Sequence, residues 1–279
     1  MRAAFDKGVT WVDTAEAYGA GRSEELVGQA IAGRDDVLVC TKVVFQPFGS
    51  GLDAAGIRKG AEASLHRLRR EAIDLYQLHL PDPAIPVEES WAAMMRLVEA
   101  GLVRAIGVSN FPPDLVERCE HIRHVDSVQL HCSLLYREDY QRLLPLCQAQ
   151  GTGILAYGPL GFGVLAGTMT THTRFAADDW RSGKVPVPVP LYQQIFAPGH
   201  FERHLRVVDA VRPIAQRRGL SLAQLALAWV IHQPGITAAI VGARSVSHIT
   251  EAASASSITL SAQDLADIEA ACARVQAGD

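Results

Sequence analysis

The stretch VTWVDTAEAYGAGRSEELVGQAIAGRDDVLVCTK, residues 9–42, contains the pattern that decides the fold. A short β-rich run, Val9–Asp13, is followed by an amphipathic segment, Ser23–Ala32, and then by a second apolar run, Val37–Lys42. Nearly continuous apolar runs separated by helices are typical of parallel strands that are covered on both faces. The stretch therefore predicts a β–α–β unit with parallel strands.

The same alternation continues along the rest of the chain. Further expected strands are Ile73–His79, Val103–Val108, Ser127–His131, Gly153–Tyr157 and Thr237–Val241, and further expected helices are Gly56–Leu68, Val87–Ala100 and Pro112–Arg118. Such an alternation fits either a closed barrel or an open doubly wound sheet. The barrel is favoured because no G-x-G-x-x-G opens a helix after the first strand, and because polar residues end many different strands, which in a barrel meet at one mouth. We expect one α/β domain over residues 1–279, a (β/α)8 TIM barrel.

The expected strands number seven, whereas a barrel of this kind has eight. The sequence starts within a helix-like segment, RAAFDKG, at residues 2–8. One β–α unit averages roughly 30 residues, so we expect the first strand and the start of its helix to be absent. The prediction is an N-terminally truncated barrel with seven of the eight parallel strands, in which Val9–Asp13 takes the second place. Two explanations are open: the natural gene begins upstream of a misassigned internal methionine, which we expect, or the chain is a weakened barrel that compensates by partner contact or lost activity.

Composition limits the classes of function. The net charge is −4 and the basic residues are scattered, so the sequence offers no continuous positive surface to a nucleic acid. The five cysteines lack a C-x-x-C pair and are odd in number, which is typical of reduced cytosolic thiols. There is no secretion signal, and no apolar run approaches the ~20 residues of a membrane span. We expect a cytoplasmic protein with no metal, nucleic-acid or membrane partner; the oligomeric state is not predicted.

Four polar residues lie at or just after the carboxyl ends of expected strands, namely Asp13, Tyr18, Lys42 and His79. Each has an ordinary structural explanation: Asp13 can cap a turn, Lys42 can extend from a rim, and Tyr18 and His79 can be interior side chains. Together they would converge on one face of a barrel, where catalytic residues gather. The Asp13 carboxylate would pair there with the Lys42 ammonium.

Six segments, in this order, resemble the aldo-keto reductase superfamily. They are VTWVDTAEAYGAGRSEELVG (9–28), VLVCTK (37–42), IDLYQLHLPD (73–82), IGVSNF (106–111), ILAYGPLGFGVLAG (154–167) and IVGARS (240–245). The resemblance implies an NADPH-dependent reductase of an aldehyde or ketone with the catalytic tetrad Asp13, Tyr18, Lys42 and His79. In it Tyr18 donates the proton and Lys42 lowers the pKa of that phenol from ~10. Asp13 holds Lys42, and His79 hydrogen-bonds the carbonyl oxygen.

The resemblance also implies that NADP(H) lies extended across the barrel mouth. Ser109, Asn110 and Gln129 would hold the nicotinamide carboxamide, and Tyr157 would stack on the ring, although a buried strand aromatic explains Tyr157 nearly as well. A loop that glycine allows to approach the pyrophosphate closely is formed by Pro159, Leu160, Gly161 and Gly163.

The last segment resembles the family's binding site for the 2′-phosphate of NADPH. Gly242 and Arg244 precede an expected helix, Ser247–Ala253, and a helix N-terminus beside an arginine favours anions. Glu251 matches an adenine-contacting acid. The sequence departs from the family at His248, where glutamine or arginine is usual, and at Ala252, where asparagine is usual. We expect NADP(H) preference through Arg244, with weaker adenosine contacts.

The carbonyl substrate is not predicted by the sequence. A long irregular stretch, Thr168–His200, resembles the loop that covers the cofactor, and Phe45 and Phe48 are candidates for a pocket wall, ahead of Trp91, which we expect to be packing, and Trp180. One alternative is a catalytically weak NADP(H)-binding regulatory subunit that resembles potassium-channel β-subunits, which tend to lack the tetrad histidine that His79 supplies here. The other is an unrelated β/α-barrel lyase or isomerase, which the segment around Arg244 disfavours.

Overall fold

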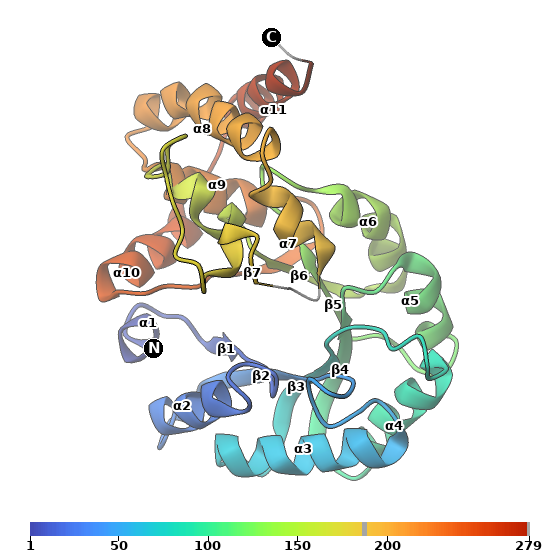
Figure 1. Cartoon of the computed structure of the whole chain (residues 1–279). Coiled ribbons are helices and arrows are strands. Elements are labelled where there is room, and N and C mark those ends of the chain that lie inside the picture. Colours follow the sequence, from blue (N-terminus) through green and yellow to red (C-terminus); the bar gives the residue numbers. More distant parts are fainter. Residues whose placement is uncertain (186–188, 278–279) are drawn as a thin grey trace.

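The computed structural model of the chain describes residues 1–185 and 189–277. Seven strands form one sheet in the order β1-β2-β3-β4-β5-β6-β7, and every neighbouring pair is parallel. The strands are β1 (Trp11–Asp13), β2 (Leu38–Val43), β3 (Ile73–Leu78), β4 (Val103–Ser109), β5 (Ser127–His131), β6 (Gly153–Tyr157) and β7 (Ile236–Ile240). Figure 1 shows them as a nearly closed barrel. The prediction of an α/β barrel with seven parallel strands is confirmed.

Helices follow the strands and cover the outside of the barrel (Figure 1). The helices that follow β1 to β5 are α2 (Arg22–Ala30), α3 (Ala54–Leu68), α4 (Val87–Glu99), α5 (Pro113–Glu120) and α6 (Glu138–Gln150), and the short α1 (Arg2–Phe5) precedes β1. Local chemistry fixes their ends, as where the Asp53 side chain accepts a hydrogen bond from Gly56 N at the start of α3. The Trp91 side chain on α4 is fully buried, as expected for a packing residue.

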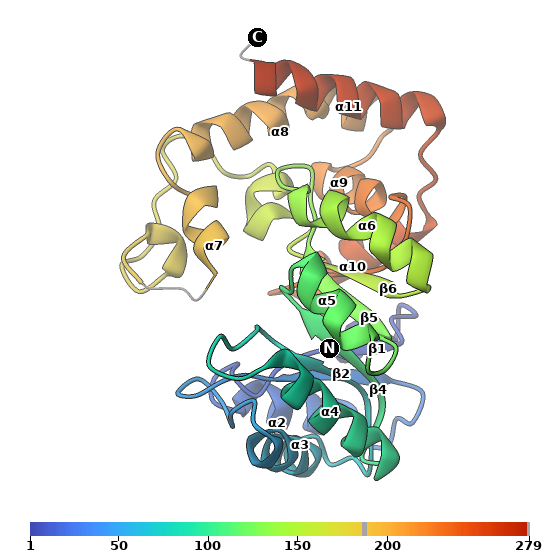
Figure 2. The same cartoon turned by 90° about the vertical axis from the view of Figure 1, so that its right-hand side faces the viewer.

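Two further groups of helices follow β6. They are α7 (Pro190–Ile195), α8 (His200–Arg217) and α9 (Leu222–Ile231) before β7, then α10 (Val246–Ser254) and α11 (Ala262–Ala277). The helices α8 and α11 pack together at one end of the molecule, away from α2 and α3 (Figures 1 and 2). The 3-10 turns η1 (Gly161–Ala166) and η2 (Trp180–Ser182) and the short η3 (Ala255–Ser257) complete the described elements. The Thr168–His200 stretch is therefore partly helical, which corrects the expectation of an irregular loop; its residues 186–188 lie outside the described residues.

The barrel core is buried on both sides of the strands. All five residues of β5 are buried, and β2 and β4 alternate little, as parallel strands covered by helices require. Close helix packing depends on Gly28 in α2, where a Cβ atom would lie 2.5 Å from the Arg67 carbonyl oxygen of α3. The two ends of the sheet are less covered, because the described residues of β1 and β7 are half-buried or exposed and none of the α10 residues is buried.

Candidate active site

The four candidate catalytic residues lie at the carboxyl end of the first three strands. Asp13 is the last residue of β1, Lys42 is the fifth residue of β2, and His79 follows β3 directly. Tyr18 lies in the loop between β1 and α2, whose backbone is tied to β2 by the hydrogen bond from Glu16 N to Lys42 O (3.2 Å). The structure thus brings together all four residues that the sequence singled out.

Lys42 and Asp13 form a buried ion pair. Lys42 Nζ lies 2.5 Å from Asp13 Oδ1 and donates a second hydrogen bond to the Thr14 carbonyl oxygen at 2.9 Å. The lysine side chain is fully buried and the aspartate side chain is 9% exposed. Burial opposes the ammonium, but the Asp13 carboxylate and neighbouring groups outweigh it and raise the pKa of Lys42 above its ordinary value. Lys42 is therefore a fixed cation beneath the barrel mouth.

Tyr18 and His79 lie above this pair and against each other. The two rings meet edge to face with centroids 5.5 Å apart, and Lys42 Nζ lies 5.5 Å from the centre of the Tyr18 ring. Tyr18 is 43% exposed, so part of the residue is accessible to solvent at the barrel mouth. Desolvation raises the pKa of Tyr18, while the Lys42 charge lowers it by less. The Lys42 charge thus acts in the direction that the sequence predicts, but burial has the larger and opposite effect, and the pKa of Tyr18 is raised overall.

His79 is held neutral. Burial, with a smaller contribution from the Lys42 charge, lowers the pKa of His79 to about 3. Its Nδ1 atom is buried without a hydrogen-bond partner among the described residues. Its carbonyl oxygen accepts a hydrogen bond from Asn110 Nδ2 at 3.2 Å, which connects the end of β3 to the end of β4.

The candidate carboxamide residues form a second cluster beside the first. Asn110, with a left-handed φ of 59°, follows β4 and donates to Ser109 Oγ at 3.0 Å, while its Oδ1 accepts from Tyr157 Oη at 2.7 Å. Gln129 on β5 donates from Nε2 to Asp13 Oδ2 at 2.8 Å. Because Gln129 contacts the Asp13 carboxylate, the two clusters are joined by a direct hydrogen bond.

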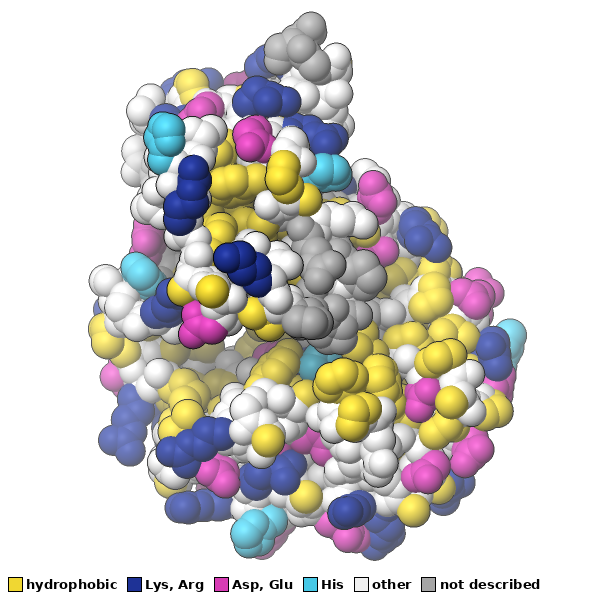
Figure 3. All heavy atoms as spheres, viewed as in Figure 1, with side chains coloured by type: hydrophobic (Ala, Val, Ile, Leu, Met, Phe, Trp, Pro, Cys, Tyr) yellow, Lys and Arg dark blue, Asp and Glu magenta, His cyan; other side chains and the backbone are white. Residues whose placement is uncertain are grey.

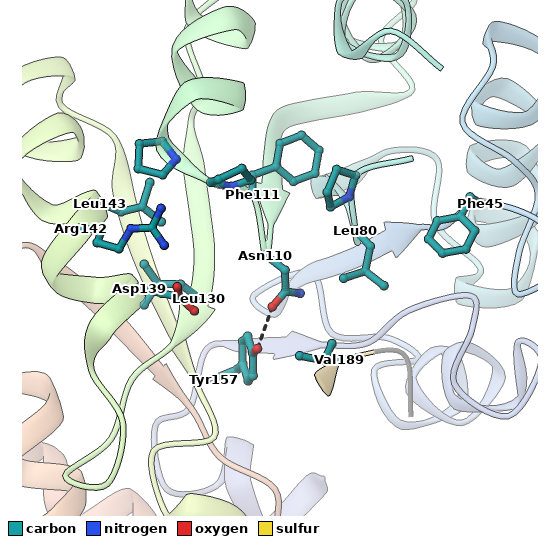
Figure 4. Close-up of a pocket in the computed structure, with 13 residues that line it drawn as sticks. Phe45, Leu80, Asn110, Phe111, Leu130, Asp139, Arg142, Leu143, Tyr157 and Val189 are labelled. Atoms are coloured by element: carbon teal, nitrogen blue, oxygen red, sulfur yellow. Dashed lines mark hydrogen bonds between the residues drawn. The ribbon is translucent and has the colours of Figure 1, made fainter. Parts of the chain in front are cut away.

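An open cavity of about 400 Å³ lies beside this second cluster (Figure 4). Asn110 and Tyr157 lie near its middle, Phe45 is at one end, and Asp139 and Arg142 of α6 are at the other. Phe45 is thus a wall residue as expected, whereas Phe48 is absent from the lining and is 58% exposed. Basic and acidic side chains are interspersed over the face shown in Figure 3.

The loop after β6 is held by aromatic packing. Pro159 and Leu160 form a turn that leads into η1, where Gly161, Phe162 and Gly163 all have left-handed φ values. The Phe162 ring stacks on the buried His131 ring and meets Trp180 and Tyr192 edge to face. Trp180 is therefore part of the segment that packs over this side of the mouth.

The candidate phosphate seat lies between β7 and α10. Gly242, Arg244 and His248 are exposed, Glu251 is half-buried, and Ser245 Oγ accepts from His248 N at the helix start. No described residue forms an ion pair with Arg244 within 4.0 Å. Hydrogen bonds from Arg181, with a smaller effect of the Arg244 charge, lower the pKa of Asp179 to about 2. Arg244 is thus within electrostatic range of the segment that contains Trp180.

Three residues that support the candidate site were not predicted from the sequence. Glu16 accepts hydrogen bonds from Val44 N, Ser50 N and Ser50 Oγ, and so fixes the loop that carries Phe45. Gln77 on β3 is fully buried and bonded to Gln129. Tyr192 on α7 packs against Tyr157 with ring centroids 6.2 Å apart. A polar residue inside an apolar strand, as in IDLYQL, was the available signal for Gln77.

Neither a membrane-spanning helix nor a metal cluster was found in residues 1–185 and 189–277. No helix there combines the length and the apolar character that crossing a membrane requires. Within the same ranges, no three His, Cys, Asp or Glu side chains gather as metal ligands would.

The fold and site define an α/β-barrel protein with a polar cluster at the carboxyl ends of its strands. Residues 1–273 match the model of the Aldo/keto reductase family, and the chain belongs to that family. It is 36% identical over 276 residues to aldo-keto reductase YhdN of Bacillus subtilis (strain 168), covering 96% of this chain and 81% of the relative.

Solved structures agree with this assignment. The glycerol dehydrogenase AKR11B4 from Gluconobacter oxydans superposes with a TM-score of 0.87 at 33% identity, covering 98% of this chain and 83% of that one. An aldo/keto reductase from Klebsiella pneumoniae, solved in complex with NADP and acetate, superposes with a TM-score of 0.74 at 34% identity, covering 96% and 82%.

Proposed function

We propose that this protein uses NADPH to reduce an aldehyde or ketone to an alcohol, with Tyr18 as the proton donor. The observation that carries the proposal is the buried Lys42–Asp13 pair, which lies directly below the Tyr18 ring and next to a neutral His79. A catalytic acid must be protonated and within hydrogen-bond reach of the developing oxyanion. The raised pKa of Tyr18 keeps the phenol protonated at neutral pH.

Each of the four residues has a distinct part in this reaction. When bound, reduced nicotinamide supplies the hydride that reaches the carbonyl carbon. Tyr18 donates its hydroxyl proton to the carbonyl oxygen, and the Lys42 ammonium stabilises the phenolate that remains. Asp13 keeps Lys42 charged and in place. His79 is neutral, so it can donate one N–H to the same oxygen without competing as an acid.

The residues at the mouth fit a nicotinamide dinucleotide. Ser109, Asn110 and Gln129 present amide and hydroxyl groups at adjacent strand ends, and Tyr157 offers an aromatic face beside a cavity large enough for a ring. Across the mouth, the glycine loop Pro159, Leu160, Gly161 and Gly163 would border the pyrophosphate. Gly242, Arg244, His248 and Glu251 would hold the adenosine end, and the exposed Arg244 guanidinium suits a 2′-phosphate.

The state of the cysteines supports an inference about the cellular compartment. All five cysteines are free and buried, which supports a reducing compartment, and we infer the cytoplasm. The partner is then a small-molecule carbonyl compound.

The Tyr18→Phe variant tests the proposal. General acid catalysis contributes roughly 10²–10⁴-fold to rate, so NADPH oxidation with a generic aldehyde should fall by about that factor. The partly exposed ring is kept, so NADPH binding, followed by fluorescence titration, should change less than about twofold. Tyr76→Phe is a matched control, because it removes a hydroxyl from a buried tyrosine of β3 whose oxygen lies against Gly60 of α3. Turnover within tenfold of wild type in Tyr18→Phe would contradict the assigned proton donor.

A further inference from the structure

The polar residues inside the barrel form one connected chain below the mouth. Gln129 Nε2 donates to Asp13 Oδ2 at 2.8 Å and to Gln77 Oε1 at 3.0 Å. Gln77 Nε2 then donates to Ser127 Oγ at 3.1 Å, and the Cys40 thiol donates to Gln77 Oε1 at 3.3 Å. Gln77 and Cys40 are fully buried, and Gln129 and Ser127 are nearly so.

The negative charge on Asp13 determines which groups donate and which accept along this chain of hydrogen bonds. A carboxylate accepts hydrogen bonds and cannot donate, so the group of Gln129 that faces it must be the NH2. Both hydrogens of that NH2 are then used, one by Asp13 and the other by Gln77 Oε1. If Gln129 were turned over, its oxygen would face two acceptors; if Gln77 were turned over, two NH2 groups would face each other. The orientation shown is the one that satisfies every member.

The consequence concerns the other end of the Gln129 amide. With both N–H groups committed, Gln129 can only accept at Oε1, and none of the described residues donates to that atom. Gly107 on β4 leaves room for these hydrogen-bonded side chains, because a Cβ atom at this position would overlap Ser127 Oγ.

We propose that Gln77 is a positioning residue that holds the Gln129 amide with its NH2 on Asp13 and its oxygen turned toward the carboxamide NH2 of the nicotinamide. This inference rests on the proposed function, because it assumes that a nicotinamide dinucleotide occupies the mouth. It makes Gln129 an acceptor for the carboxamide and joins the cofactor to the Asp13–Lys42 pair through a single side chain.

The test compares two cofactors that differ at one group. In 3-acetylpyridine adenine dinucleotide phosphate, a methyl replaces the carboxamide NH2 and the carbonyl is kept. Dissociation constants for this analogue and for NADP⁺ are measured by fluorescence titration. A lost hydrogen bond corresponds to roughly a three- to tenfold change in affinity, so the wild type should bind NADP⁺ tighter by about that factor.

Three variants separate positioning from general damage. Gln77→Leu removes the acceptor for Gln129, so the preference for NADP⁺ over the analogue should fall below about twofold. Gln77→Glu, neutral when fully buried, can accept from Gln129 and donate to Ser127, and should keep the preference. Tyr76→Phe, on the neighbouring position of β3, should keep it as well. The ratio of two affinities is insensitive to the fraction of folded protein in each sample.

The outcomes are distinct. A preference that survives in Gln77→Leu, or is lost equally in Gln77→Glu and Gln77→Leu, overturns the positioning role. Binding of both dinucleotides without preference in the wild type overturns the acceptor role of Gln129 while leaving the proposed function intact. Absence of any dinucleotide binding to the wild type overturns the proposed function, and this inference falls with it.

Discussion

The ion pair between Lys42 and Asp13 allows a quantitative prediction of stability. Breaking a buried pair by removing one partner costs about 3–5 kcal/mol, because the other charge stays buried and uncompensated. Lys42 is fully buried and Asp13 is 9% exposed, so the pair falls within this class. We expect Lys42→Met and Asp13→Asn each to lower the free energy of unfolding by about 3–5 kcal/mol.

The double variant distinguishes a pair from two independent residues. Lys42→Met with Asp13→Asn leaves no charge unpaired, and the amide oxygen introduced by Asp13→Asn can still accept a hydrogen bond from Gln129. The double variant should therefore be at least as stable as either single variant, which corresponds to a coupling energy of about 3 kcal/mol or more. Urea unfolding followed by tryptophan fluorescence measures all four proteins, since Trp91 and Trp229 are both fully buried.

An exposed pair supplies the control. Arg58 and Glu62 form an i, i+4 ion pair on α3 with side chains 61% and 54% exposed. Exposed pairs of this kind couple by about 0.3–0.5 kcal/mol. A Lys42–Asp13 coupling no larger than that of Arg58–Glu62, or additive losses in the double variant, would refute the description of a buried pair.

Two further predictions concern the cofactor and pH. Removing the 2′-phosphate partner in Arg244→Ala should weaken NADPH binding by roughly ten- to a hundredfold, since a charge-assisted bond contributes ~1.5–3 kcal/mol, and leave NADH unchanged; equal losses in titrations of both would remove Arg244 from this role. Burial lowers the pKa of His131 to about 3, so the unfolded chain gains a proton below pH ~6.5 while the folded protein does not until about pH 3. Stability should therefore fall by about 2 kcal/mol between pH 7 and 5 on account of this histidine. That part of the loss should vanish in His131→Phe when urea unfolding is repeated at both pH values, whereas identical pH dependence in the variant and the wild type would show that His131 does not titrate in this way.

The sequence predicted the strands well because parallel strands leave a strong local mark. Apolar runs such as Val37–Lys42 and Ser127–His131 are buried on both faces, and the structure places β2 and β5 within a residue of the expected ends. The proximity of Asp13 and Lys42 also followed from their places at the ends of neighbouring strands. Parallel strands of a barrel align their carboxyl ends, so residues that end neighbouring strands lie close together.

Other features depend on spatial balance that the sequence does not express. The pKa of Tyr18 is set by burial and the Lys42 charge acting in opposite directions, and their relative size requires the structure. Gln77 was passed over because one glutamine in an apolar strand has no visible partner in the sequence, while Gln129 lies 52 positions away. Tyr192 was missed because α7 falls in a stretch that lacks helical periodicity.

The central claim is hydride transfer from NADPH to a carbonyl carbon, and an isotope label tests it most directly. The protein is incubated with a generic aldehyde and NADPH that carries two deuterium atoms at carbon 4 of the nicotinamide, and the product is analysed by mass spectrometry. The account predicts an alcohol with one deuterium on the former carbonyl carbon, formed by the wild type and nearly absent with Tyr18→Phe. Binding of NADPH without formation of alcohol, or alcohol without deuterium, would contradict it, and the first result would favour a regulatory protein that holds the cofactor.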